Sequence, residues 1–462
     1  MQGMRQRANF SAAIAPDFSC CRVNIAMNNS AIRSREMQLS SDADIKPRWG
    51  ALMLLMLVYS VHSIDRTAFN VLLQPIGREF ALSDGQIGLL AGFVYTIPFA
   101  LAALPVAALA DRVNRKRLLA LLLFTWSLAT LFARWAVNFP MLTGLRAIVG
   151  ASEAGSPPTC LSLISDLFPP RLRPTAVSIF YIGAPIGVLV GSAIAGKVSS
   201  IWGWRWALMA IGLPGILLAL ILMVALRNPA RHVESGGQGT ELAPARRIVR
   251  WFIKPEIAMT VAAMVVASMV VLGVGAWASV LLIRERAVPI AEAGMGLGLV
   301  LGGGGIIGTL LGGLAARFQA DGDDRRLLAI AGLAALAGTP CLAIALMSGS
   351  GTMTLIALVP YSILLSSYYG PAFGFCLNLA PSSVRARALA VIFILCNIVG
   401  GGLGPLSIGL LSDWLKGAGD PFPLTHALGL MVLLSALAGT LFMGAALQMR
   451  RVAHRGDTMP AE

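Results

Sequence analysis

Apolar runs of about 20 residues recur along most of this chain, and they constrain its fold more than any other feature. A helix of that length rises about 30 Å, which is the thickness of the hydrocarbon core of a membrane. Of the 462 residues, 56% are hydrophobic and only 13% are charged, too few to cover a soluble protein of this size. Backbone in lipid must satisfy its own hydrogen bonds, and the period-2 alternation of a β-barrel is absent. We therefore predict an all-α membrane protein.

The apolar runs fall into two groups of six. One long polar stretch, residues 227–254, is predicted to be a cytoplasmic linker between a six-helix bundle over 48–226 and a second one over 255–449. Residues 1–47 are predicted to be a disordered tail and residues 450–462 a second tail, both cytoplasmic. The twelve expected transmembrane helices are 49–76, 86–110, 116–137, 140–167, 174–198, 203–226, 255–283, 291–316, 326–348, 353–379, 386–413 and 425–448.

The basic residues predict the orientation. Most of the 36 lysines and arginines fall on one side of the membrane if both termini are cytoplasmic, which the positive-inside rule favours. The same rule accounts for the net charge of +14, so no nucleic-acid partner is implied. We expect a multi-pass protein of a bacterial inner membrane, and a monomer.

The two halves also repeat each other. The stretches FPPRLRPTAVSIF (168–180) and APSSVRARALAVIF (380–393) each place an Arg-x-Arg pair before an apolar helix. A tandem repeat of helical units is typical of transporters that rock two bundles around a central site.

Three ionisable side chains interrupt the first span, in VYSVHSIDRTAFN (58–70). A charge at the centre of a span costs about 3 kcal/mol, so such residues are rare and usually functional. His62, Asp65 and Arg66 are spaced i, i+3 and i+4, which places them on one side of the helix. That side is expected to face the interior of the bundle.

The fourth span carries a second charged pair, in RAIVGASEAG (146–155). Arg146 and Glu153 are seven residues apart and share one helix face. From the depth of each residue along its span, we expect Asp65 to contact Arg146. Glu153 then lies closer to the membrane midplane, and Arg66 is available to Glu153 or to a substrate. These groups can change partners when a proton or an anionic substrate arrives, although a fixed ion pair that only positions the two spans is an alternative.

The loop after the second span, AALADRVNRKR (107–117), resembles a motif of the major facilitator superfamily. The resemblance implies two six-helix bundles and a loop that locks them together on the inner side. The residues that would form this lock are Asp111, Arg112, Arg115, Arg171 and Arg173. The two glycines of the motif are replaced by Ala107 and Asn114, and a plain positive-inside loop is the alternative.

Glycine and proline recur in the fifth and eleventh spans, in YIGAPIGVLVGSAIAG (181–196) and GGGLGPLSIGLLSD (400–413). Small residues let helices approach closely in membranes. Helix packing or gating is predicted for Gly150, Gly183, Pro185, Gly187, Gly404 and Pro405.

Within the superfamily, SIDR in the first span, EFALSDGQIGLL (79–90) and SDLFPPRLRPTAVSIFYIGAPIG (165–187) resemble the spinster-like group. Animal members of that group export sphingosine phosphate or lysophospholipids. The resemblance implies a secondary transporter for an amphipathic or organic-anion substrate, such as a lysolipid or a long-chain-base-like compound. The buried charges of the first and fourth spans predict that transport is coupled to protons. A multidrug efflux antiporter, an organic-acid symporter and a membrane sensor or scaffold are the alternatives.

We expect no enzymatic activity, since no cluster of nucleophile and base is apparent, and no metal site or cofactor. Polar residues in or near spans could line a cavity or could serve packing alone: Asn70, Tyr95, Tyr181, Tyr369 and Asn397. Asp166 and Asp413 lie at span ends, and we interpret them as solvated caps.

Overall fold

The computed structural model describes residues 48–169, 171–226, 245–317, 324–381 and 384–456, so the predicted tail 1–47 lies outside it. The first bundle, here the N bundle, consists of α2 (Trp49–Glu79), α3 (Asp84–Ala91), α4 (Phe93–Arg112), α5 (Arg115–Phe132), η1 (Ala133–Trp135), α6 (Phe139–Glu153), α7 (Ser156–Leu167), α8 (Arg173–Trp202) and α9 (Trp204–Ala225). The second, the C bundle, consists of α10 (Ala245–Phe252), α11 (Pro255–Arg284), α12 (Ile290–Leu297), η2 (Gly298–Gly303), α13 (Gly304–Arg317), α14 (Asp324–Met347), α15 (Gly351–Ser367), α16 (Tyr369–Leu379), α17 (Arg385–Leu395), η3 (Cys396–Leu403), α18 (Gly404–Gly417) and α19 (Pro423–Gly456).

Within the described residues, eleven helical segments are long and apolar enough to cross a membrane. The predicted fourth span, 140–167, is instead built from two shorter helices, α6 and α7, that meet at Gly155. Pro157 and Pro158 occupy the first turn of α7 and have no backbone N–H. The carbonyl of Glu153 therefore has no donor four residues further on, which explains why the helix breaks beside this charged residue.

Two differences from the sequence prediction concern segments between and after the bundles. Residues 245–252 of the predicted linker form the helix α10, and α19 continues to Gly456, beyond the predicted end of the bundle at 449. Both extensions place apolar and basic residues at the spacing of a helix. A count of apolar residues alone does not detect this pattern. The remainder of the linker, 227–244, lies outside the described residues.

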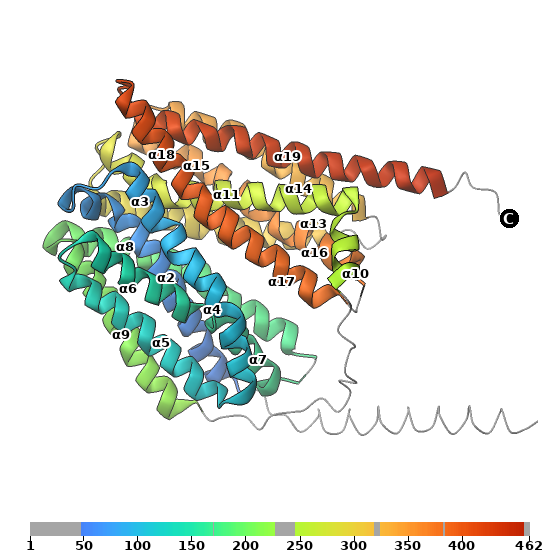
Figure 1. The fold of residues 1–462 in the computed structure, drawn as a ribbon, viewed down its shortest axis with the longest axis horizontal. Helices are drawn as coiled ribbons and strands as arrows, with labels where there is room; N and C mark the ends of the chain where they lie inside the picture. Colours follow the sequence, from blue (N-terminus) through green and yellow to red (C-terminus); the bar gives the residue numbers. More distant parts are fainter. Residues whose placement is uncertain (1–47, 170, 227–244, 318–323, 382–383, 457–462) are drawn as a thin grey trace, which may run out of the picture.

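The two bundles join at one end of the molecule, which we call the outer end because the charge distribution predicts that it faces away from the cytoplasm. Leu72 and Ile76, near the outer end of α2, share one apolar cluster with Trp277 and Ile408 of the C bundle. Leu55, nearer the opposite end of α2, belongs to a separate cluster confined to the N bundle. Figure 1 shows the bundles meeting at α3 and α18 and diverging toward α7 and α10.

Close helix contacts across this outer interface come in two matching pairs. Helix α3 packs on α18 and α4 on the π-helix η3, while α8 packs on α12 and on the π-helix η2. A Cβ atom on Gly88 of α3 would lie 2.6 Å from the carbonyl oxygen of Pro405, and one on Gly196 of α8 would lie 2.6 Å from that of Ile290. Only glycine permits backbones to approach this closely. The arrangement closes the outer end.

Candidate functional site

A buried ion pair joins the first and fourth predicted spans. The Nη1 atom of Arg146 in α6 lies 2.8 Å from Oδ1 of Asp65 in α2, as the helix spacing predicts. Thr130 of α5 donates a hydrogen bond to the other carboxylate oxygen of Asp65. The ring of Phe69 lies 4.2 Å from the guanidinium carbon of Arg146. The ion pair and its partners thus come from three helices, α2, α5 and α6, and the charges compensate each other, as buried charges require.

Glu153 lies deeper in the same bundle and is fully buried, with 0% of its surface exposed. The hydroxyl of Tyr95 in α4 donates a hydrogen bond of 2.6 Å to its Oε2 atom, and Nδ1 of His62 lies 3.3 Å from the same atom. Its other oxygen, Oε1, has no hydrogen-bond partner among the described residues. Glu153 thus has a phenol and an imidazole beside it, whereas Asp65 is paired with an arginine.

Tyr95 connects Glu153 to the Asp65–Arg146 ion pair, and close packing at Gly150 sets the position of Tyr95. A Cβ on Gly150 would collide with the carbonyl oxygen of Tyr95, so α4 can lie against α6 only because this residue is glycine. The ring of Tyr95 lies 4.9 Å from the guanidinium carbon of Arg146 and 5.1 Å from that of Arg66. One aromatic side chain therefore touches both arginines and hydrogen-bonds Glu153.

Arg66 is half-buried and, within the described part of the chain, forms no ion pair. A Cβ on Gly401 of η3 would lie 3.7 Å from its Nη2 atom, so the guanidinium reaches the C bundle. Its contact is with Tyr95 rather than with Glu153, which the sequence had offered as a partner. Arg66 is thus a cation between the two bundles without an anion.

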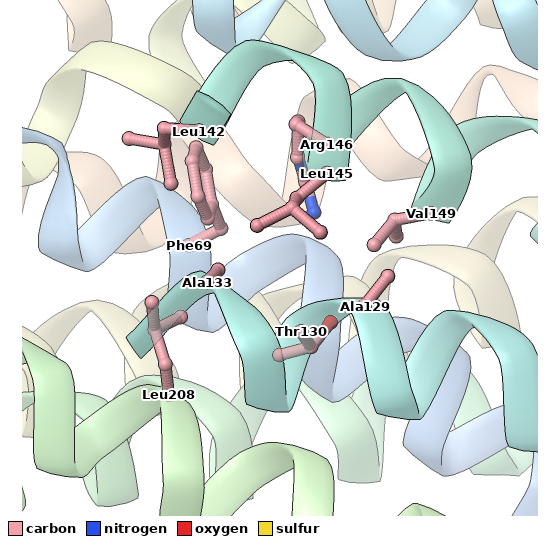
Figure 2. Close-up of a pocket in the computed structure, with 9 residues that line it drawn as sticks. All are labelled: Phe69, Ala129, Thr130, Ala133, Leu142, Leu145, Arg146, Val149 and Leu208. Atoms are coloured by element: carbon pink, nitrogen blue, oxygen red, sulfur yellow. The ribbon is translucent and has the colours of Figure 1, made fainter. Parts of the chain in front are cut away.

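A narrow pocket lies beside the ion pair (Figure 2). In Figure 2, Arg146 and Leu145 of α6 face Thr130 of α5 across the pocket, and Phe69 of α2 and Leu208 of α9 also line it. Apart from Arg146 and Thr130, its lining is apolar. This environment offers Asp65 no further polar partner from that side.

The other polar candidates differ in their surroundings. Tyr95 is buried at the centre of the site, whereas Tyr181 and Tyr369 are exposed. Tyr181 packs edge-on against Tyr59, which in turn stacks on His62. Tyr369 stacks on Tyr368, at 4.4 Å between ring centroids.

The two asparagines make different contacts, one within its own span and one between the bundles. The side-chain amide of Asn397 donates to the carbonyl of Phe393, one turn earlier in the same helix. The carbonyl of Asn70 accepts a 2.7 Å hydrogen bond from Ser279 of the C bundle.

The predicted inner lock makes contacts within the N bundle only, as far as the described residues go. Arg115 pairs with Asp166 of α7 at 2.5 Å, and Arg173 donates to the carbonyl of Phe168. Asp166 is therefore an ion-pair partner, and its interpretation as a solvated cap was wrong. Arg112 and Arg171 are exposed at the open end of the bundles, and the side chain of Asp111 lies outside the described part.

A charged cluster at the outer end, absent from the sequence prediction, joins the two bundles; here it is called the outer cluster and consists of Gln74, Asp84, Gly85, Arg284, Ser412 and Asp413. The Nη1 atom of Arg284 lies 2.6 and 2.8 Å from the two carboxylate oxygens of Asp84. Ser412 donates to Asp84 at 2.7 Å, and Nε of Arg284 donates to Gln74 at 3.0 Å.

Asp413 completes the outer cluster from the C bundle. Its carboxylate accepts hydrogen bonds from the backbone N–H groups of Asp84 (2.9 Å) and Gly85 (2.7 Å), which begin α3. It caps the positive end of a helix in the other bundle, so its interpretation as a solvated cap was also wrong. The signal missed was the pairing of Ser-Asp motifs at residues 83–84 and 412–413, one in each half.

The predicted glycine and proline positions all lie at helix contacts. Gly183 and Gly187 of α8 approach the backbone of α2, at Met56 and Ser60. Within the C bundle, Gly404 approaches the carbonyl of Met269, and the carbonyl of Pro405 accepts a 2.9 Å hydrogen bond from Trp277. The carbonyl of Pro185 lies at the contact between α8 and η2, opposite Gly302. These contacts establish packing, while gating stays a prediction.

No group of three or more histidine, cysteine, aspartate or glutamate side chains in the described ranges could hold a metal ion.

Comparison with known proteins agrees with this architecture. The family model described as Major Facilitator Superfamily matches residues 55–405. An MFS-type efflux pump of Mycolicibacterium smegmatis is 28% identical over 401 residues, covering 85% of this chain and 91% of the relative. Protein spinster homolog 1 of Mus musculus is 28% identical over 430 residues, covering 86% and 80%.

Among solved structures, a bacterial homolog of the human lysosomal transporter Spinster, in an inward-facing and unoccupied conformation, is 27% identical with a TM-score of 0.77. The match covers 86% of this chain and 97% of that one. A D-xylose-proton symporter, at 15% identity and a TM-score of 0.65, shares the fold alone. The chain belongs to the major facilitator superfamily of transporters and resembles its spinster-like members.

Proposed function

We propose that this transporter couples the movement of an amphipathic organic anion to that of protons, by alternating access of a central site. One observation carries the proposal: among the described residues, Glu153 is fully buried without a guanidinium partner, next to the Asp65–Arg146 ion pair and to Arg66, which has no anionic partner there. Burying unpaired charges is costly, so groups arranged in this way are usually functional.

Glu153 is the proposed proton-carrying group. A carboxylate removed from water can hold a proton when no strong cation neutralises it. Its Oε1 atom, which has no hydrogen-bond partner among the described residues, can bind that proton, while Oε2 keeps the hydrogen bond from Tyr95. Asp65, held by Arg146 and Thr130, is the proposed second member of the relay.

Arg66 is the proposed partner for the anionic head group of the substrate. It is half-buried between the bundles, where it contacts Tyr95 of the N bundle and lies near Gly401 of the C bundle. An aromatic side chain beside this cation suits a substrate with an apolar body, since aromatic rings bury large area and also tolerate a polar group. A lysolipid with an anionic head group or a long-chain-base phosphate meets both requirements.

Efflux of drug-like compounds is the second candidate function. Two relatives favour it: the Mycolicibacterium efflux pump, and a protein of Acinetobacter baumannii named as a quinolone resistance transporter, 30% identical over 172 residues, or 36% of this chain and 39% of that relative. A flat aromatic acid would use the same cation and the same rings. Residence in a bacterial inner membrane as a monomer with both termini cytoplasmic belongs to the proposal in either case.

The test uses purified protein in liposomes with an imposed pH gradient, screened against lysolipids, long-chain bases and aromatic acids. We expect Glu153→Gln to reduce gradient-driven accumulation by at least tenfold, since glutamine still accepts from Tyr95 but carries no proton. Asp65→Asn should have a similar effect. Glu292→Gln, which removes an exposed carboxylate of α12, is the matched control and should transport normally.

Asp65→Asn leaves Arg146 buried without its anion, so its folding is checked through the thermal unfolding midpoint. Substrate exchange without a pH gradient measures substrate transport alone and therefore separates it from proton coupling. If Glu153→Gln accumulates substrate under the gradient as the wild type does, Glu153 is not the coupling group.

A further inference from the structure

The short helix α10 lies at the membrane surface because a short connection joins it to a membrane-spanning helix. It ends at Phe252, and the membrane-spanning helix α11 begins at Pro255, with only two residues between them. Two intervening residues extend about 10 Å at most between the helix ends. The charge distribution predicts that this end of α11 is cytoplasmic.

One side chain fixes α10 on the C bundle. Trp251 is 3% exposed and belongs to the apolar core, and its Nε1–H donates a 3.2 Å hydrogen bond to the carbonyl of Leu379 at the end of α16. Its ring packs edge-on against Phe252. The rotation of α10 about its own axis is therefore set, and so is the direction of its remaining side chains.

The side chains of α10 that point away from the C bundle form one basic stripe and one apolar stripe. Arg246 and Arg250 are four residues apart, and Arg247 is their neighbour; all three are exposed. No acidic partner for them occurs among the residues the structure describes. Beside them, Val249 is 54% and Ile253 is 68% exposed. At 100° per residue these two lie between the arginines and the half-buried Phe252.

We propose that α10 is an anchor for anionic phospholipid head groups on the cytoplasmic leaflet. Val249 and Ile253 insert at the boundary of the hydrocarbon, and Arg246, Arg247 and Arg250 bind the phosphates above them. A helix with a basic face beside an apolar face, parallel to the membrane, has this affinity. The commitment to lipid follows from the distance to α11, because exposed apolar side chains this close to the bilayer meet lipid before any soluble partner.

The anchor acts on one bundle only. The fixed contacts of α10 are with α11 and α16 of the C bundle. Bound lipid would hold the inner end of that bundle at the head-group level while the N bundle moves against it. The amount of anionic lipid in the membrane would then influence the rate of the transport cycle.

The test compares lipid retention by full-length proteins from nanodiscs that contain phosphatidylcholine and phosphatidylglycerol, measured by native mass spectrometry. We expect the triple variant Arg246→Gln, Arg247→Gln, Arg250→Gln to retain at least tenfold less phosphatidylglycerol than the wild type. Its matched control neutralises three exposed basic residues at the outer end: Arg78→Gln, Lys197→Gln and Lys416→Gln. This control should retain lipid normally.

A second variant, Val249→Ser with Ile253→Ser, keeps the charges and removes the apolar stripe. It should also lose phosphatidylglycerol, and raising the salt concentration should release lipid from the wild type. Since Trp251 is unchanged in every variant, the thermal unfolding midpoint in detergent should not move. Wild-type retention by the triple variant would overturn the proposal and leave α10 as a docking surface for a protein. The measurement needs no substrate, so it is independent of the proposed function.

Discussion

At the scale of single residues, Tyr95 is the side chain on which the site depends most. Its hydroxyl holds Glu153 while its ring contacts Arg66 and Arg146. Tyr95→Phe keeps the ring and removes only the hydrogen bond to a carboxylate, a contact that contributes about 1.5–3 kcal/mol. We expect gradient-driven transport to fall by about tenfold or more, measured in liposomes at equal protein density.

The chain offers a close control for this change in Tyr361. This tyrosine is equally buried, in the C bundle, and its hydroxyl has no hydrogen-bond partner among the described residues. Tyr361→Phe should leave transport and stability unchanged. An equal loss in both variants would mean that Tyr95 acts through general packing, contrary to the proposed contact with Glu153.

The residue contacts predicted from the sequence were those marked by charge. Asp65 and Arg146 had to face inward because lipid does not tolerate them, and helix geometry then fixed their relative depth. Tyr95 and Thr130 lie on α4 and α5, where no buried charge indicates how the helix is rotated about its axis. The contact of Tyr95 with Glu153 depends on Gly150, which brings α4 and α6 together, and that of Thr130 with Asp65 depends on the rotation of α5.

At the scale of elements, the break between α6 and α7 separates the charged half of the fourth span from its inner half. Replacing both Pro157 and Pro158 by alanine supplies the missing N–H donors and should join the two helices into one. We expect this double variant to keep or raise the thermal unfolding midpoint. Transport should nevertheless fall by about tenfold, because a straightened helix moves Glu153 relative to Tyr95.

Pro214→Ala provides the comparison, since Pro214 lies inside α9 and no buried charge is near it in sequence. Transport by that variant should stay normal. If the double variant also transports normally, the break has no part in positioning Glu153. The break lies in a stretch of small and polar residues, SEAGSPPT (152–159), and its Pro-Pro pair was the available signal.

At the scale of the whole molecule, the sequence predicted two bundles but not the end at which they close. The inner lock was expected from a motif, yet Arg115 pairs within its own bundle, and the contacts seen between the bundles include those of the outer cluster. Whether the inner-lock contacts or the outer-cluster contacts form depends on the conformation, and the sequence contains the residues for both. A sequence motif therefore identifies a lock without saying whether it is engaged.

The outer cluster predicts how the conformational equilibrium responds to mutation. Arg284→Gln leaves the buried carboxylate of Asp84 without its cation, which costs about 3–5 kcal/mol when a pair is fully buried and less here, where Arg284 is partly exposed. That cost applies only while the outer end is closed. We expect the population with an open outer end to rise by at least tenfold, seen as a longer distance between spin labels at Val137 and Lys416 on a cysteine-free background.

Arg286→Gln is the matched control, because Arg286 lies two residues away and, among the described residues, donates only within its own bundle, to Glu285, Leu346 and Thr425. Its loss should lower the thermal unfolding midpoint without changing the label distance. A distance change of the same size in both variants would show that any arginine at this end of α11 matters, and would remove the special role of Asp84. A change in Arg284→Gln alone would mean that one buried carboxylate of the N bundle, held by Arg284 and Ser412 of the C bundle, determines how readily the outer end opens.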